Sequence, residues 1–278
     1  MTKASLQNLE RLRDFLKFQV LQPFIFQVYK PIGYSSYTIA DIFKQLLKTK
    51  VGHAGTLDPL ARGTMVLLSD YATKLTQDFT HKPKKYTIEL VLGIATPSFD
   101  LESPFQTPNT PVKLINNIAH PLERVFSELK GTHPYPVPAK SAVKYKGRPL
   151  YTMDNPPTIE KKMTIIEYSV QATTPMTVQD LQSKLVHIKT ALIENKKQYE
   201  ELAETMQILT RPRQVTLFDN LIHKLESNLS QLENLEDLEL VQAKVELVVS
   251  SGTYIRSIAQ KVSEMLKIPL TIVDIERV

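Results

Sequence analysis

Gly52-His53-Ala54-Gly55-Thr56-Leu57-Asp58-Pro59-Leu60-Ala61-Arg62-Gly63 is a stretch dense in turn-forming residues. It holds three of the eight glycines in the chain, one proline and one acidic residue, Asp58. Because glycine and proline favour defined turns, we expect a loop of fixed shape that holds the Asp58 carboxylate in place. Such a carboxylate can be a nucleophile, a general base, a metal ligand or a cap, and on residue type alone the cap is the commonest use. The six histidines are scattered, so a metal site lacks support.

Hydrophobic periodicity outlines the elements around this loop. We expect strands at 24–29, 65–68, 86–92, 163–172, 243–250 and 270–275. We expect helices at 4–17, 38–48, 112–129 and 254–266, and loops at 103–111 and 131–151. Because the strands and helices do not alternate regularly as βαβ units, the pattern predicts an α+β fold.

Residues 175–240 form a distinct insertion, within a stretch from 148 to 251 that has no glycine. Apolar residues recur there in alternating three- and four-residue steps, interrupted at 211–213. The first series is Val178, Leu181, Leu185, Ile188, Leu192, Asn195, Tyr199, Leu202, Met206 and Leu209, and the second is Val215, Phe218, Ile222, Leu225, Leu229 and Leu232. Nine of the ten positions in the first series are apolar; Asn195 is the polar exception, and such a residue can fix helix register or oligomeric state. The spacing predicts an antiparallel helical hairpin with its own apolar seam, begun by a Thr177–Asp180 capping pair. The alternative is a pair of ordinary helices that pack on the rest of the protein.

Composition excludes several classes of protein. The 278 residues are 42% hydrophobic and 23% charged and include no cysteine, which rules out disulfides, thiolate metal sites and a cysteine nucleophile. No apolar run reaches the roughly 18 residues that span a bilayer. The N-terminus, with Lys3, Glu10, Arg11, Arg13 and Asp14, is too charged for a secretory signal. We therefore expect a soluble, cytoplasmic protein with no membrane association.

Charge is distributed unevenly along the chain. The net charge is +5, but residues 175–240 carry seven basic and eleven acidic residues. Residues 129–151 contain no acid; they carry Lys130, Lys140, Lys144, Lys146 and Arg148, interleaved with Tyr135, Tyr145 and Tyr151. Positive charge for phosphates and aromatic faces for bases are typical of an RNA-binding segment, and a solvated basic loop is the alternative.

Several motifs, in the same order along the chain, resemble those of the TruB-type pseudouridine synthases. Residues 52–63 resemble the catalytic loop G-H-x-G-x-L-D-P-x-A-x-G of that family, and Lys30–Ser36 resembles its K-P-x-G-x-[ST]-S segment. Further matches are Ala72-Thr73-Lys74, Lys85-Tyr86 with Leu92-Gly93 and Asp100, Ser141–Lys144, Gly147–Tyr151 and Gly252-Thr253-Tyr254-Ile255-Arg256. The resemblance covers about residues 24–174 and 241–278.

The resemblance implies a fold and a division into domains. It implies an α+β fold with a mixed, largely antiparallel sheet and flanking helices, interrupted by the antiparallel helical hairpin. The catalytic domain would comprise residues 23–174 and 241–278, with an RNA-binding loop at about 129–151. Residues 1–22 would be an N-terminal helical extension and 175–240 the inserted hairpin. The additional C-terminal RNA-binding domain of many relatives would be absent.

The resemblance also implies roles for individual residues. Asp58 would be the catalytic aspartate, Arg256 would pair with it, and Tyr86 would lie against the flipped uracil. His53 would fill the space that the flipped base vacates, and Tyr254 and Ile275 would line the pocket. Lys30 and Arg277 would make structural or phosphate contacts. Lys140, Lys144, Lys146 and Arg148 would grip the RNA.

The implied reaction is the isomerisation of uridine to pseudouridine at position 55, in the T-loop of tRNA, without a metal or an organic cofactor. The substrate partner would be the T-arm, and residues 175–240 would bind a protein partner, bind a second copy, or be tolerated without a role. Two alternatives stay open: a guide-RNA-dependent enzyme that acts on ribosomal RNA, and a tRNA-folding chaperone that uses the same surface without chemistry.

Overall fold

Two compact units make up the described chain. The structure is a computed structural model that describes residues 16–106, 118–141, 143–208, 211–235 and 238–278. Within these ranges, the first unit comprises the residues up to Lys82, Lys184–Glu226 and Ile275–Val278. The second unit comprises Pro83–Ser183 and Ser227–Asp274. The expected helix at 4–17, the start of the expected helix at 112–129, and Ala142 and Leu209 lie wholly or largely outside the described residues.

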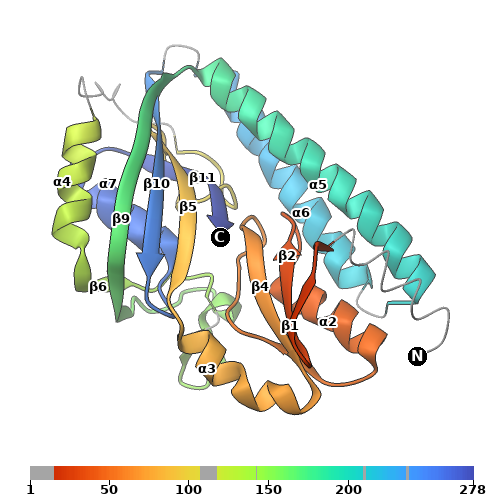
Figure 1. Ribbon diagram of the computed structural model, residues 1–278. Coiled ribbons are helices and arrows are strands. Elements are labelled where there is room, and N and C mark those ends of the chain that lie inside the picture. Colours follow the sequence, from red (N-terminus) through yellow and green to blue (C-terminus); the bar gives the residue numbers. More distant parts are fainter. Residues whose placement is uncertain (1–15, 107–117, 142, 209–210, 236–237) are drawn as a thin grey trace. The chain divides into compact units, whose positions relative to one another are not determined.

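The first unit contains a small sheet (Figure 1). The strands β1 (Gln19–Gln22), β2 (Ile25–Lys30), β3 (Val51–His53) and β4 (Arg62–Ser69) belong to it. β2 pairs antiparallel with β1 and β4, and β3 pairs antiparallel with β4. The last residues of β11 (Leu270–Arg277) pair parallel with β4, with Arg277 opposite Gly63. Residues 19–22, which the sequence placed in a helical extension, are thus a strand, because β1 folds back on β2 as a hairpin.

The helix α2 (Ser36–Leu47) follows β2 and covers part of this unit. The Thr38 backbone N–H donates to Ser35 Oγ at 3.0 Å, which caps the helix N-terminus. Lys48 ends the helix in the left-handed conformation. The apolar residues Ile39, Ile42 and Phe43 are buried, as the expected helix at 38–48 requires. The short helices η1 (Asp70–Leu75) and α3 (Thr76–His81) follow β4.

The second unit contains an antiparallel sheet in the order β5-β10-β9-β6. Its strands are β5 (Lys84–Leu92), β6 (Gly131–Pro136), β9 (Glu160–Met176) and β10 (Leu240–Val249). The helices α4 (Ala119–Leu129) and α7 (Ile255–Leu266) pack on each other, and α4 also packs on β9 (Figure 1). Phe126, Ile258 and Val262 of these helices are buried, and the Phe126 ring stacks on Tyr168 of β9. The mixed, largely antiparallel strands and flanking helices confirm the expected α+β fold.

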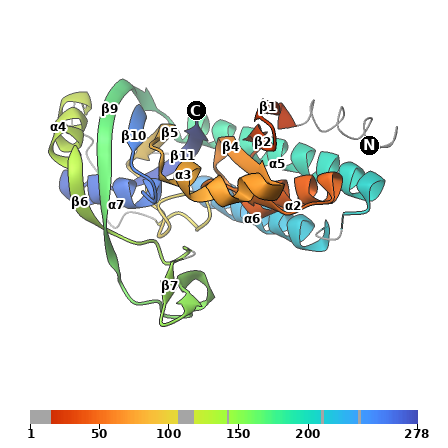
Figure 2. The same ribbon diagram turned by 60° about the horizontal axis from the view of Figure 1, so that its bottom comes forward.

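The segment at 131–151, expected as a loop, is more ordered than its prolines indicate. Its first residues form β6, and its later residues form the hairpin β7 (Lys144–Tyr145) and β8 (Arg148–Pro149), followed by η2 (Leu150–Thr152). Lys146 and Gly147 connect β7 to β8 with positive φ at both positions, as a tight type I′ hairpin turn requires. Figure 2 shows this hairpin standing away from the sheet of the second unit.

The insertion folds as the expected pair of helices, α5 (Val178–Met206) and α6 (Arg211–Leu232), which lie side by side in Figures 1 and 2. Thr177 and Asp180 form the expected cap, with the Asp180 N–H donating to Thr177 Oγ1 at 3.1 Å. Lys189 pairs with Glu226 at 3.6 Å and Lys196 with Asp219 at 2.5 Å. The later residue of α5, Lys196, thus pairs with the earlier residue of α6, Asp219, so the two helices are antiparallel.

The packing of this hairpin differs from the expectation of a self-contained seam. Residues 184–226 belong to the first compact unit together with β2 and α2. The buried ring of Tyr34 packs edge-on against Phe218 and Tyr199, with ring centroids 5.1 and 5.6 Å away. The expectation of a hairpin with its own apolar seam is therefore wrong for this part of the insertion, because its apolar side chains complete the core of the first unit. The alternative, a pair of helices that pack on the rest of the protein, describes this part better.

Among the described residues, no helix is long and apolar enough to cross a membrane.

Candidate active site

Asp58 lies in the loop between β3 and β4, and the backbone on both sides of it is fastened. The Leu57 N–H donates to Ser36 Oγ at 2.8 Å, and the same hydroxyl donates to Leu57 O at 3.0 Å. The Gly33 N–H donates to Pro59 O at 2.8 Å. The Asp58 residue is half-buried. The segment 30–36 and the loop 52–63, which the sequence singled out separately, thus form one structure that fixes the Asp58 backbone.

Lys30 lies under this loop and is fully buried. Its ammonium donates to the carbonyl oxygens of Tyr34, Pro31 and Pro59 at 2.8, 3.2 and 3.3 Å. Burial lowers the pKa of Lys30 to about 7; the Asp58 carboxylate opposes this shift and the Arg277 guanidinium adds to it. Of the two roles that the sequence left open for Lys30, these contacts support the structural one.

Arg277 fastens the other end of the loop from β11. It is buried, and its Nε donates to Thr64 O at 2.6 Å and its Nη2 to Gly55 O at 3.3 Å. Gly63 permits this approach, because a Cβ there would lie 2.2 Å from Arg277 O. These bonds to backbone carbonyls support a structural role for Arg277 as well.

His53 and Ile275 also lie in the first unit. His53 ends β3 and is half-buried. Burial lowers the pKa of the His53 imidazole, and the Arg277 charge lowers it further, while the Gly55 backbone partly offsets both. The ring is therefore biased towards its neutral form, which suits stacking. Ile275 is buried on β11.

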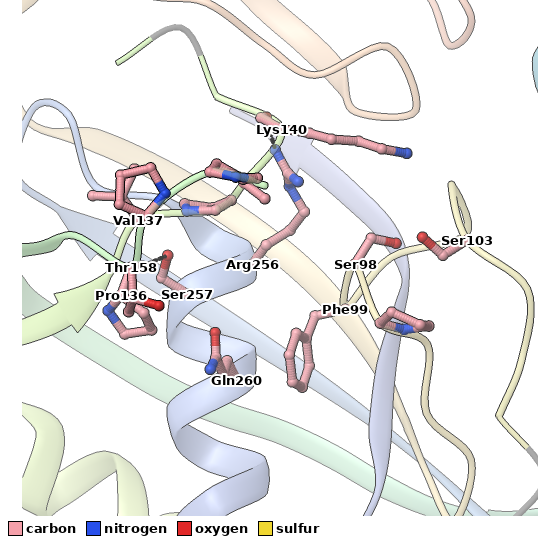
Figure 3. Close-up of a pocket in the computed structure, with 15 residues that line it drawn as sticks. Ser98, Phe99, Ser103, Pro136, Val137, Lys140, Thr158, Arg256, Ser257 and Gln260 are labelled. Atoms are coloured by element: carbon pink, nitrogen blue, oxygen red, sulfur yellow. Dashed lines mark hydrogen bonds between the residues drawn. The ribbon is translucent and has the colours of Figure 1, made fainter. Parts of the chain in front are cut away.

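Arg256 lies in the first turn of α7, in the second unit, and is buried. Its Nε lies 3.4 Å from Asp100 Oδ2, and its Nη2 donates to Lys140 O at 3.2 Å. In Figure 3 the guanidinium extends from the helix towards the Lys140 segment. The structure thus gives Arg256 a carboxylate partner that the sequence did not assign; the expected pairing of Arg256 with Asp58 stays a prediction.

Asp100 is the site residue that sequence reasoning missed. Ser98 Oγ and the Glu102 N–H donate to Asp100 Oδ1 at 2.6 and 3.0 Å. Burial nevertheless raises the pKa of Asp100 to about 6, against the lowering by the Arg256 charge. The signal in the sequence was the acid in the turn 97–102, which matched a family motif but received no role.

Tyr86 and Tyr254 belong to the second unit. Tyr86 is buried on β5, paired with Leu247 of β10. Tyr254 is half-buried at the residue that precedes α7, two positions from Arg256. The late motif 252–256 therefore forms the turn into α7 and the start of that helix.

A pocket of about 380 Å³ opens beside Arg256 (Figure 3). Three segments enclose it together with α7: residues 97–103, 136–140 and 156–158. Arg256, Ser257 and Gln260 contribute from α7, and Ser257 Oγ donates to Pro136 O at 2.5 Å. The walls combine proline rings with the polar side chains of Arg256, Ser257 and Gln260, so the pocket offers both apolar and polar surface.

The basic segment presents its charges to solvent. Lys144, Lys146 and Arg148 are exposed on the β7–β8 hairpin, and Lys146 Nζ lies 5.4 Å from the Tyr145 ring centre. Lys140 is exposed and pairs with Glu102 at 3.6 Å. Tyr135 is fully buried, with its OH donating to Leu129 O at 3.5 Å, so its expected role as a base-stacking face is wrong. The Tyr151 side chain lies outside the described part of the structure.

In the described ranges, no group of three or more His, Asp or Glu side chains could hold a metal ion.

Comparison with protein families places the Asp58 loop within a known domain. Residues 44–192 match the model of the TruB family pseudouridylate synthase (N terminal domain). This match covers more than half of the chain and includes Asp58, Tyr86 and the basic segment.

Curated proteins with related sequences agree. The chain is 42% identical over 130 residues to tRNA pseudouridine synthase B of Caldicellulosiruptor saccharolyticus, over 46% of this chain and 43% of that protein. It is 35% identical over 131 residues to the Parabacteroides distasonis protein of the same name, over 45% of this chain and 54% of that protein. The Bacteroides fragilis protein is 24% identical over 86% of this chain and 78% of its own length. The chain thus spans about half the length of the first two relatives.

Solved structures give a weaker likeness. A Cbf5–Nop10–Gar1 complex has a chain that is 17% identical, with a TM-score of 0.47, over 90% of this chain and 46% of that chain. An H/ACA RNP bound to a substrate RNA has one that is 15% identical, with a TM-score of 0.46, over 90% and 44%.

Proposed function

The chain belongs to the TruB family of pseudouridylate synthases, and on this basis we propose that it isomerises uridine to pseudouridine at position 55, in the T-loop of tRNA. The observation that carries the proposal is Asp58, held in the family's loop by hydrogen bonds to the backbone of both its neighbours. A backbone fixed on both sides of Asp58 limits the positions that its carboxylate can take, which supports a role for it as a reacting group.

The reaction exchanges one bond for another within the nucleotide. The C1′–N1 bond breaks, the uracil turns, a C1′–C5 bond forms, N1 gains a proton and C5 loses one. Uracil is both the leaving group and the returning nucleophile, so no atom is added from outside. Asp58 would either attack the nucleotide or remove a ribose proton. Arg256 would keep the Asp58 carboxylate ionised, and Tyr86, with a phenol that can transfer protons, would lie against the flipped uracil near C5.

The RNA must release the target base from its stack, which costs a few kcal/mol. We assign the compensating contacts to Lys140, Lys144, Lys146 and Arg148, because they are exposed and gathered in one segment. The neutral bias of His53 suits an imidazole that occupies the vacated space. Tyr254 and Ile275 would complete the lining of the uracil pocket.

We also propose the T-arm as the part of tRNA that the chain recognises, and the cytoplasm as the place of reaction. The names of the relatives specify tRNA, and the organisms are bacteria. A protein partner or a second copy on the exposed faces of 175–240 is a separate proposal, which light scattering of the purified protein would test.

The test is to incubate the purified chain with an unmodified tRNA transcript and map pseudouridine at nucleotide resolution. We expect conversion at position 55, on whole tRNA and on an isolated T-arm stem-loop. A transcript with cytidine at position 55 is the matched control and should stay unmodified. Binding of tRNA without any pseudouridine would favour the chaperone function, and modification only of ribosomal RNA with a guide would favour the other alternative.

A further inference from the structure

We infer that the α5–α6 hairpin is a positioning element for the catalytic loop, acting through the amide side chains of Gln214 and Asn195. This inference rests on the proposed function and goes beyond it, because it gives a catalytic consequence to an insertion that carries none of the family motifs. The contact is with residues 32–38, the segment that in turn fastens the Asp58 loop.

Gln214 makes the central contact from α6. It is 1% exposed, and its Nε2 donates to Gly33 O at 2.8 Å. Its Oε1 accepts from the Ser35 N–H at 3.2 Å and from Thr38 Oγ1 at 2.7 Å. One side chain thus satisfies a carbonyl, an amide and a hydroxyl in the turn that leads into α2. A buried polar group that lost these partners would be costly, so the turn and the helix are bound to one geometry.

Asn195 makes the second contact from α5. Its Nδ2 donates to Ile32 O at 3.0 Å, and its backbone carbonyl accepts from Tyr34 OH at 3.0 Å. The sequence marked Asn195 as the polar exception in an apolar heptad series, where such a residue can set helix register or oligomeric state. Its observed partner is instead the backbone of residue 32, so its polarity serves the contact with the catalytic segment.

The fit between hairpin and segment is close. Gly33 has φ +91°, and a Cβ there would lie 2.3 Å from the Phe218 ring and 2.6 Å from Leu192 Cδ2. The hairpin therefore packs directly on the Gly33 backbone. Tyr34, fully buried between Tyr199 and Phe218, prevents this segment from sliding along the helices.

The segment transmits this position to Asp58 by three contacts on its other side. The Gly33 N–H donates to Pro59 O, Ser36 Oγ bonds to both Leu57 backbone groups, and Tyr34 O accepts from buried Lys30. Each residue that is hydrogen-bonded to the Gln214 or Asn195 side chain is therefore within three positions of one that holds the loop. Displacement of a reacting group by about 1 Å can cost about 100-fold in rate.

The test is the Gln214→Ala variant, assayed by single-turnover conversion of a T-arm stem-loop at saturating enzyme. We expect the rate constant to fall by about 10- to 100-fold while the dissociation constant for RNA stays within about 2-fold. Gln214→Glu keeps the two accepted hydrogen bonds but sets a buried carboxylate oxygen against Gly33 O, so its rate should fall at least as far as that of Gln214→Ala. Amide hydrogen exchange at Leu57 and Gly33 should quicken in step with the loss of rate.

The matched control is Lys196→Ala, which removes an exposed ion pair with Asp219 from the same hairpin without touching residues 32–38. It should change neither the rate constant nor exchange at Leu57. A folded Gln214→Ala protein with a wild-type rate constant, or equal losses in Lys196→Ala, would overturn the inference. If Gln214→Ala does not fold, Asn195→Ala decides by the same measurements.

Hydrogen exchange separates this inference from the proposed function. If the wild-type chain makes no pseudouridine, the proposed function fails; faster exchange at Leu57 and Gly33 in Gln214→Ala would still support the positioning contact, and unchanged exchange would reject it.

Discussion

The Asp58 loop and the Arg256 pocket are stabilised by different kinds of interaction. The loop, in the first unit, is fastened by hydrogen bonds that end on backbone groups, including all three bonds of the buried Lys30 ammonium. The pocket, in the second unit, is organised by the buried ion pair of Arg256 with Asp100. The hydrogen bonds to backbone groups fix the position of Asp58. The ion pair instead favours the charged forms of Arg256 and Asp100.

The two regions also respond to pH in opposite directions. Burial lowers the pKa of Lys30 to about 7 and raises that of Asp100 to about 6. Both shifts favour the neutral form, since burial disfavours charge. Because the two groups titrate in different pH ranges, the free energy of unfolding measured above pH 7 tests Lys30, and that measured below about pH 6 tests Asp100.

Among the changes that compare these two regions, the largest effect is expected from Arg256→Met. The substitution leaves Asp100 buried without its counter-charge and removes the expected partner of Asp58. Removing one member of a buried pair should lower the free energy of unfolding by about 3–5 kcal/mol. Separately, because Arg256 is proposed to keep the Asp58 carboxylate ionised, we expect the folded variant to convert the T-arm stem-loop about 1,000-fold more slowly. Arg124→Met, which replaces an exposed arginine paired with Glu128 on α4, is the control and should be unaffected. Normal turnover by Arg256→Met would show that Arg256 takes no part in the reaction.

A smaller effect is expected from the pH dependence of Lys30. Its folded-state pKa lies below the unfolded value of 10.5, so between pH 7 and 10.5 the unfolded chain binds the proton more tightly. The free energy of unfolding should therefore rise with pH in this window, by about 2 kcal/mol between pH 7 and 9 from this group alone. Urea unfolding of the wild type and Lys30→Met would measure the difference. If the free energy of unfolding changed with pH in the same way in both proteins, the lowered pKa of Lys30 would be contradicted.

The titration of Asp100 should change the free energy of unfolding in the opposite direction to that of Lys30. Its folded-state pKa lies above its unfolded value of 3.8, so the folded chain holds the proton more tightly between pH 3.8 and about 6. The free energy of unfolding should fall by roughly 1–2 kcal/mol as pH rises through this window, and Asp100→Asn should lack that fall. Urea unfolding at pH 4.5 and 6.5 measures both, and a wild-type fall no larger than that of Asp100→Asn would contradict the raised pKa.

The smallest effect per residue is expected on the basic segment, which tests RNA binding. Replacing Lys140, Lys144 and Lys146 together with Ala should weaken tRNA binding and reduce the slope of log affinity against log salt by about two to three. The control replaces three lysines of the acidic insertion: Lys184, Lys197 and Lys224. Titrations at several salt concentrations would measure the slopes, and an unchanged slope in the first variant would place the RNA elsewhere.

The sequence predicted the elements well where periodicity was strong, as in the apolar series of α5 and α6 and the buried face of α2. It missed β1 because Gln19–Gln22 are exposed and carry no alternating apolar pattern. It missed β6 because two prolines lie within Gly131–Pro136, which is an edge strand, where proline is tolerated.

The site shows a similar division. The loop motif pointed to Asp58, but the roles of Gln214 and Asn195 depend on contacts between residues about 160–180 positions apart. Local spacing does not report such contacts. Tyr135 was misjudged for the same reason, since a tyrosine in a basic segment looks the same in sequence whether its ring faces solvent or the core.

Asp58→Asn tests the central claim most directly. The substitution keeps the size of the side chain and removes its charge, so the loop contacts and the RNA-binding surface should persist. Single-turnover incubation with unmodified tRNA should yield no pseudouridine, while the dissociation constant for tRNA stays within about 3-fold of the wild type, since binding depends on phosphate contacts. Asp78→Asn, an exposed aspartate of α3 in the same unit, should convert tRNA normally. Conversion by Asp58→Asn at the wild-type rate would contradict the account.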